Sequence, residues 1–167
     1  MVAKYISPQN PLEWIRGNIT LKSGASIIWR AITRAAHILQ NILSWQIGSG
    51  AKVRIGTDSW SGSGEFHKLS TFIIEHLAHR NIFYLAQIVD RVHSSWRDQA
   101  WLQAGDLGLP QEGPRVWQQY IWALKASNIR ITDHEDNLIW VVSKTGHYAP
   151  KLGYLELIKH REPPIKD

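Results

Sequence analysis

The chain has 167 residues, enough for one domain, and its 44% hydrophobic and 20% charged residues are typical of a folded globular protein. It has no cysteine, which excludes disulfides, thiol catalysis and zinc sites built on thiolates, and which fits an intracellular location, nuclear or cytoplasmic. No apolar run approaches the roughly 18–20 residues that cross a bilayer, so we expect no membrane partner.

The net charge of +5 is concentrated in the first third of the chain. Seven basic residues stand against two acidic ones up to Trp60, whereas the remainder carries twelve of each. Such asymmetry favours an anionic partner, and nucleic acid is the usual one. The alternative is a solvated basic face that only keeps the protein soluble.

The first elements are an irregular segment and a long amphipathic helix. Residues 1–23 show no clear period, whereas residues 27–43 have strong helical periodicity. One stripe of this helix is apolar and expected to pack, and the opposite stripe is basic. The apolar stripe comprises Ile28, Ile32, Ala35, Leu39 and Ile42, and the basic stripe comprises Arg30, Arg34, His37 and Asn41.

The next stretch, "SWQIGSGAKVRIGTDSW" at residues 44–60, raises the question of a phosphate-binding loop. A P-loop needs a glycine at position 45, which is Trp, and a hydroxyl after Lys52, where Val53 stands. The dinucleotide fingerprint also lacks its third glycine. We therefore predict a β-hairpin in which residues 45–47 pair with 53–55, while Lys52 and Arg54 point outward.

Further elements follow in chain order. Residues 70–79 and 94–104 predict helices, residues 82–92 are ambiguous between strand and helix, and Pro114 fits the first turn of another helix. The apolar face of that helix comprises Val116, Trp117, Tyr120, Ile121 and Leu124. Residues 128–132 and 137–143 predict two strands joined by acidic "DHED", and a last short helix starts at Pro150.

The expected fold is therefore α+β, mainly short helices with two β-hairpins, with an incomplete domain as the alternative. The chain divides by sequence into five segments. These are an irregular segment at 1–23, a basic helix plus hairpin at 24–60, a helical spacer at 61–128, a hairpin plus helix at 129–160, and a tail at 161–167.

Two groups of residues suggest metal chemistry, and each has a more ordinary interpretation. His67, His76 and His79 are the best metal candidates, but surface or boundary histidines are far commoner. The acidic cluster at 133–136 suggests magnesium, but acids between strands usually accept backbone hydrogen bonds in turns. We therefore predict no metal, no cofactor and no catalytic residue.

Most of the nine tryptophans are expected in the core, with base stacking as the alternative.

The pattern W-x-I-G-x-G-x-x-V-x-I-G-x-D-x-W resembles a segment of plant LINE-type, non-LTR retrotransposon polyproteins that lies downstream of the reverse transcriptase catalytic domain. Preceding "SIIWRAITRAAHILQNILSW" looks like the family's helix, and later "WLQAGDLGL" resembles a spacer of the same polyproteins. The matching residues of the pattern are Trp45, Ile47, Gly48, Gly50, Val53, Ile55, Asp58 and Trp60.

A second match covers the start of the family's zinc-binding region, so the resemblance spans about Lys4 to Leu157. Its residues are Leu138, Trp140, Ser143, Gly146, Tyr148, Lys151, Tyr154 and Leu157. The family's Tyr-x-Asp-Asp polymerase signature and its cysteine ligands are absent, and Ser59 stands where the family often has proline.

The resemblance implies a non-catalytic middle piece of the polyprotein, whose parent would be an RNA-directed DNA polymerase. Its expected partners are RNA or single-stranded DNA, bound weakly and without sequence preference, and the polymerase domain of the parent. The basic face predicts Arg30, Arg34, Lys52 and Arg54 as the nucleic-acid-binding residues. A protein–protein interaction module is the alternative, followed by an independent metal-dependent hydrolase.

Overall fold

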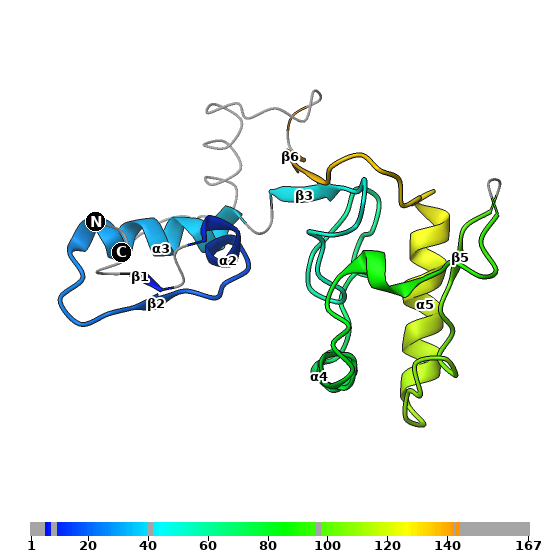
Figure 1. Cartoon of the computed structure of the whole chain (residues 1–167). Coiled ribbons are helices and arrows are strands. Elements are labelled where there is room, and N and C mark those ends of the chain that lie inside the picture. The colour runs from blue at the N-terminus through cyan, green and yellow to red at the C-terminus, as the bar shows by residue number, and fades with distance from the viewer. Residues whose placement is uncertain (1–5, 8–9, 40–41, 96–97, 142, 144–167) are drawn as a thin grey trace, which may run out of the picture. The chain divides into compact units, whose positions relative to one another are not determined.

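The fold is α+β, as the sequence predicts, and it divides into two compact units (Figure 1). The structure is a computed structural model and describes residues 6–7, 10–39, 42–95, 98–141 and 143. One unit comprises Trp45–Leu138, and the other comprises residues 1–44 with 139–167. None of the described helices has both the length and the apolar character that a bilayer crossing requires. The expected last helix from Pro150 and the tail at 161–167 lie outside the described residues.

The unit of residues 1–44 and 139–167 contains a short helix and short strands in the N-terminal segment that is expected to be irregular. Strands β1 (Ile6–Ser7) and β2 (Thr20–Leu21) pair antiparallel around helix α2 (Pro11–Ile15). Asn10 caps α2 because its side chain accepts a hydrogen bond from the Leu12 amide, and Pro11 suits the first turn. Helix α2 packs on the following helix, α3 (Ile27–Leu39).

Helix α3 forms where its periodicity predicts it, but its buried side differs from the predicted one. Ala36 is buried and Trp29 and Thr33 are half-buried, and these positions share one face at steps of four and three. Ile28 is 70% exposed and Ile32 36% exposed, so the N-terminal part of the predicted packing stripe faces outward, whereas Leu39 is half-buried and Ile42 is buried. Asn41, from the predicted basic stripe, lies outside the described residues.

The pairing predicted for the early hairpin is wrong. Strand β3 (Leu43–Gln46) pairs with β6 (Asn137–Trp140), far along the chain, rather than with residues 53–55. Trp45 instead makes an isolated parallel bridge to Trp60, and Arg54 an antiparallel bridge to Tyr84. The predicted alternation holds in part, because Val53 and Ile55 are buried and Lys52 is exposed, but Arg54, which is predicted to point outward, is half-buried. The alternating pattern predicts which apolar side chains are buried, but it does not identify the strand that pairs with β3.

The later elements agree with prediction in part. Helices α4 (Thr71–His79) and α5 (Gly113–Ala126) form as expected, and β6 occupies the predicted last strand. The ambiguous segment becomes a 3₁₀ helix, η1 (Leu85–Ile88), followed by strand β4 (Val89–Asp90). Strand β5 (Ala100–Trp101) replaces the helix predicted over 94–104 and pairs antiparallel with β4. Residues 128–132 form no strand, so the second predicted hairpin is also wrong.

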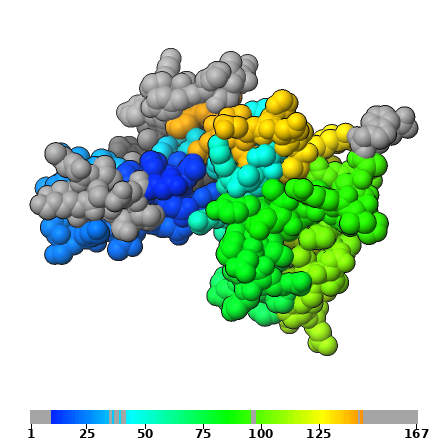
Figure 2. All heavy atoms as spheres, viewed as in Figure 1, coloured from blue at the N-terminus to red at the C-terminus, as the bar shows by residue number. Residues whose placement is uncertain are grey.

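The core of the Trp45–Leu138 unit is built on α5. Four of the five side chains of its predicted apolar face are buried. The described atoms of this unit, cyan to orange in Figure 2, form a continuous packed body. Tyr120 stacks on Trp117 and meets Trp60 edge-on, with ring centroids 5.5 and 5.3 Å apart. Trp117 also donates its indole N–H to the Leu102 carbonyl, which fixes α5 beside β5. Aromatic side chains, as predicted, therefore form much of this core.

Leu124 provides a direct test of this core. It is fully buried on α5, so we expect Leu124→Ala to lower the free energy of unfolding by about 2–5 kcal/mol through lost burial and a cavity. Exposed Lys125 is the matched control, and Lys125→Ala should change it by less than about 0.5 kcal/mol. Urea denaturation followed by tryptophan fluorescence measures both. Equal effects in the two variants would contradict the packing described.

Candidate nucleic-acid interface and the glycine loop

The glycine loop at residues 48–52 surrounds a carboxylate of the chain itself. The backbone N–H groups of Gly48 and Gly50 each donate to Asp136 Oδ1 at 2.8 Å, and that of Lys52 donates to Oδ2 at 2.9 Å. The Ser49 hydroxyl adds a longer contact of 3.4 Å to Oδ2. Asp136 is buried, so these donors replace the water that its charge would otherwise bind. The loop is an anion-binding nest, and its anion is Asp136.

Both glycines are required by this geometry. A Cβ on Gly48 would lie 2.4 Å from the His134 carbonyl oxygen, so no side chain fits there. Gly50 has a φ of +67°, which favours glycine, and a Cβ there would meet the Ala86 amide nitrogen at 2.9 Å. The same residues that suggest a hairpin turn therefore serve a long-range contact.

The nest also explains the role of the acidic cluster. Asp136 accepts backbone hydrogen bonds, as the more ordinary interpretation of the cluster predicts, although the donors come from a loop more than eighty residues away. Asp133 and Glu135 are exposed. No group of three or more metal-ligating side chains occurs among the described residues. The sequence does not reveal that the donors lie in the glycine loop, because backbone N–H groups leave no side-chain signature.

The three candidate histidines each bond to a backbone carbonyl nearby. His76 Nε2 lies 2.9 Å from the Leu107 oxygen, and His79 Nδ1 lies 2.7 Å from the Glu75 oxygen. His67 is buried, with Nδ1 2.7 Å from the Gly64 oxygen and its ring edge-on to Trp60. Burial lowers the pKa of His67 because the imidazolium loses water, and the bond to the Gly64 carbonyl partly offsets this.

The predicted basic residues fall into two pairs, one in each unit. Arg30 and Arg34 are exposed one turn apart on α3, which carries no acidic residue. Within the described residues of α3, therefore, neither guanidinium group has an ion-pair partner. Arg34 borders a cavity of about 530 Å³ in the same unit, together with Trp14, Gly17, Ile19, Leu21 and Thr33. This pair provides an exposed cationic surface beside an apolar cleft.

Lys52 and Arg54 lie in the Trp45–Leu138 unit and are less available. Lys52 Nζ is 3.5 Å from a carboxylate oxygen of Glu135, and both side chains are well exposed, so this pair contributes little to stability. Arg54 is half-buried, and its backbone N–H donates to Asp58 Oδ2 at 2.8 Å. The ion pair of Lys52 and the partial burial of Arg54 therefore favour Arg30 and Arg34 as contacts for a polyanion.

Comparison with known proteins finds no family model, no curated protein and no solved structure that matches this chain. The residues and their geometry therefore carry the functional inference.

Removing the carboxylate of Asp136 tests the nest. Asp136→Ala leaves three backbone donors without their acceptor, so we expect the free energy of unfolding to fall by at least about 3 kcal/mol. Exposed Asp133 lies in the same segment, and Asp133→Ala should cost less than about 0.5 kcal/mol. Urea titrations compare the two variants. A small effect at both positions would show that the nest does not stabilise the loop.

The lowered pKa of His67 predicts a dependence of stability on pH. As pH falls below the ordinary histidine pKa of 6.5, the unfolded chain binds a proton that the folded chain resists, so the free energy of unfolding decreases. We expect His67→Gln to reduce this decrease between about pH 7.5 and pH 5.5. Urea titrations across this range, with exposed His134→Gln as control, measure it. Identical pH profiles for wild type and the His67 variant would refute the assignment.

Proposed function

We propose that the chain is a non-catalytic segment of a LINE-type reverse transcriptase polyprotein that contacts RNA or single-stranded DNA weakly and without sequence preference. The observation that carries the proposal is the pair of exposed arginines on α3, a helix without acidic residues. The resemblance of residues 45–60 to that family, and the absence of its polymerase signature from the sequence, support the non-catalytic role.

The spacing of Arg30 and Arg34 suits a phosphate backbone. Side chains at i and i+4 are neighbours on a helix, with Cβ atoms about 5–6 Å apart, so both guanidinium groups reach the same strand. Phosphate contacts of this kind provide affinity that is lost as salt rises, and they read no sequence. The apolar cleft beside Arg34, with Trp14 in its wall, offers a place for an unpaired base next to the phosphate contact.

A second candidate, protein–protein interaction, is favoured by the isoleucines of α3. Ile27 is 84% exposed and Ile28 is 70% exposed, on the same helix as the arginines. Exposed apolar surface rimmed by charge is typical of docking faces. The polymerase domain of the parent polyprotein is the proposed partner. Copurification of a partner that survives nuclease treatment would favour this candidate over nucleic-acid binding.

The double variant Arg30→Ala/Arg34→Ala tests the nucleic-acid proposal. Losing two phosphate contacts should reduce the slope of log K against log salt by about 1.4, which corresponds to about 25-fold weaker binding at about 0.1 M salt. Fluorescence anisotropy with labelled single-stranded RNA and DNA over a salt series measures both quantities.

Arg80→Ala/Arg115→Ala is the matched control, because both arginines are exposed in the other unit and the net charge changes equally. It should retain most of the affinity. Equal losses in the two double variants would show that net charge alone drives binding. No loss in the α3 variant, or affinity independent of salt, would refute the proposed interface. The polyprotein origin is tested separately by reading the flanking genomic DNA for a Tyr-x-Asp-Asp segment upstream and a Cys/His cluster downstream.

A further inference from the structure

A second cavity, of about 450 Å³, lies within the Trp45–Leu138 unit and has the chemistry of an anion site. The described residues that line it are two arginines, three hydroxyl side chains, one amide and three aliphatic residues, and none of these is acidic. These are Arg91 and Arg130, Ser94, Ser95 and Thr132, Gln99, and Ala86, Val89 and Ile131. The volume lies within the range of about 300–1,000 Å³ that is usual for small-molecule sites. None of these residues belongs to the basic surface described above.

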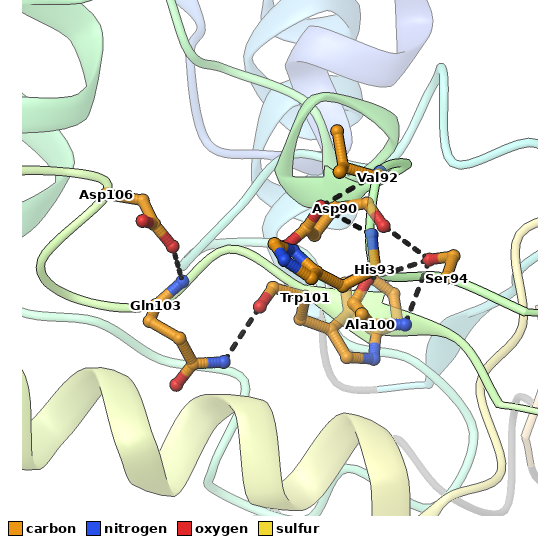
Figure 3. A network of polar contacts seen from close by, with 8 residues as sticks. All are labelled: Asp90, Val92, His93, Ser94, Ala100, Trp101, Gln103 and Asp106. Atoms are coloured by element: carbon orange, nitrogen blue, oxygen red, sulfur yellow. Dashed lines mark hydrogen bonds and ion pairs between the residues drawn. The ribbon is translucent and has the colours of Figure 1, made fainter.

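One wall of the cavity is a tightly bonded turn between β4 and β5, shown in Figure 3. The Ser94 hydroxyl donates to the Asp90 carbonyl at 2.5 Å and accepts from the Ala100 amide at 2.9 Å, which ties the two strands together. The Asp90 carboxylate accepts from the Val92 and His93 amides and contacts His93 Nδ1 at 2.6 Å. The Asp90 carboxylate is thus engaged by its own loop. The other acidic residue of this connection, Asp98, is exposed and does not line the cavity.

Gln99 connects this wall to the facing segment at 130–132. Its Oε1 accepts a hydrogen bond from the Ile131 amide at 2.7 Å, which fixes the orientation of the side-chain amide. Its Nε2 is buried and has no hydrogen-bond partner among the described residues. A buried donor without an acceptor is costly, and an oxygen atom of a bound ligand would satisfy it.

From these observations we propose that the cavity binds a phosphate-bearing ligand of nucleotide size. The guanidinium group of Arg91, with Arg130 in the same lining, matches the geometry of phosphate oxygens through paired N–H donors. The aliphatic residues of the lining provide a surface for the apolar face of a base or sugar. The ligand is a free nucleotide or one nucleotide unit of a strand, and the proposal does not depend on the role of α3.

Titration of the full chain with uridine 5′-monophosphate, uridine and inorganic phosphate tests the proposal. Isothermal calorimetry and amide chemical shifts should show binding of the monophosphate, weaker binding of phosphate, and no binding of uridine. Arg91→Glu should weaken binding of the monophosphate at least about tenfold, whereas Arg91→Lys keeps the charge and should lose less. Arg91 is exposed, so these variants are expected to fold, and circular dichroism verifies this.

Arg115→Glu is the matched control, because Arg115 is exposed on α5 and does not line the cavity. Equal weakening by the Arg91 and Arg115 variants would overturn the proposal, as would equal binding of uridine and its monophosphate. Competition by a short single-stranded RNA identifies the source of the phosphate. If the RNA displaces the monophosphate, and Arg91→Glu weakens binding of this RNA, the cavity binds one nucleotide of a strand. If the RNA does not displace the monophosphate, the cavity binds the free nucleotide. Binding that survives Arg30→Ala/Arg34→Ala separates this site from the proposed α3 interface.

Discussion

The carboxylate of Asp136 determines the conformation of the segment on which much of the Trp45–Leu138 unit depends. Three backbone N–H groups of the glycine loop converge on its two oxygens, and the loop has no regular partner strand that would otherwise satisfy them. Carbonyl groups of the loop also accept backbone hydrogen bonds from two other segments. The Gly50 carbonyl accepts from the Ala86 amide, and the Gly48 carbonyl accepts from the Thr132 amide at 2.8 Å. One buried charge thus joins three segments that are distant in sequence.

The residues downstream of the nest continue this arrangement through local and cross-chain bonds. Asp58 accepts the Arg54 amide, and the Trp45 and Trp60 segments are linked through the Trp45 amide and the Ser59 carbonyl at 2.9 Å. Trp60 then contacts Tyr120 of α5, so the loop is held against the helix that forms the core. The order of dependence runs from the carboxylate to the loop, and from the loop to the aromatic core.

Local signals in the sequence predict helices α3, α4 and α5 but miss α2 and wrongly place a helix at 94–104, and they predict the strand pairing poorly, for a physical reason. Helix α5 was predicted because Pro114 and its apolar positions lie within one element, and hydrogen bonds of a helix join neighbours in sequence. The partner of β3 is β6, and no residue within β3 encodes that choice. Gly48 and Gly50 fit a hairpin turn and a nest equally well, because both conformations need a residue without a side chain. The carboxylate that distinguishes a nest from a hairpin turn belongs to Asp136, far from the loop in sequence.

The same reasoning applies to the candidate sites. The exposure of Arg30 and Arg34 is predicted because helical periodicity places them opposite the Ile28 stripe, and it holds although the buried face is the one that carries Ala36. The Ile28 stripe was misassigned because periodicity defines faces of a helix but not which of two apolar faces finds a neighbour. Arg91 and Arg130 could not be brought together in advance, because the cavity that they share arises from the packing of the β4–β5 turn against residues 130–132. Charge patterning along the chain locates basic segments, whereas a binding cavity requires the tertiary fold.

The residues that carry the family resemblance have structural roles in this chain. Gly48 and Gly50 hold Asp136, Asp58 holds the Arg54 amide, and Trp45 and Trp60 bridge each other in the core. These five residues are buried, and none of them lines either cavity. A pattern of this kind informs about how the backbone is arranged and about ancestry, and it has no direct bearing on chemistry. The arginines of α3 and of the cavity, which lie outside the 45–60 pattern, are the groups whose chemistry suits a phosphate-bearing partner.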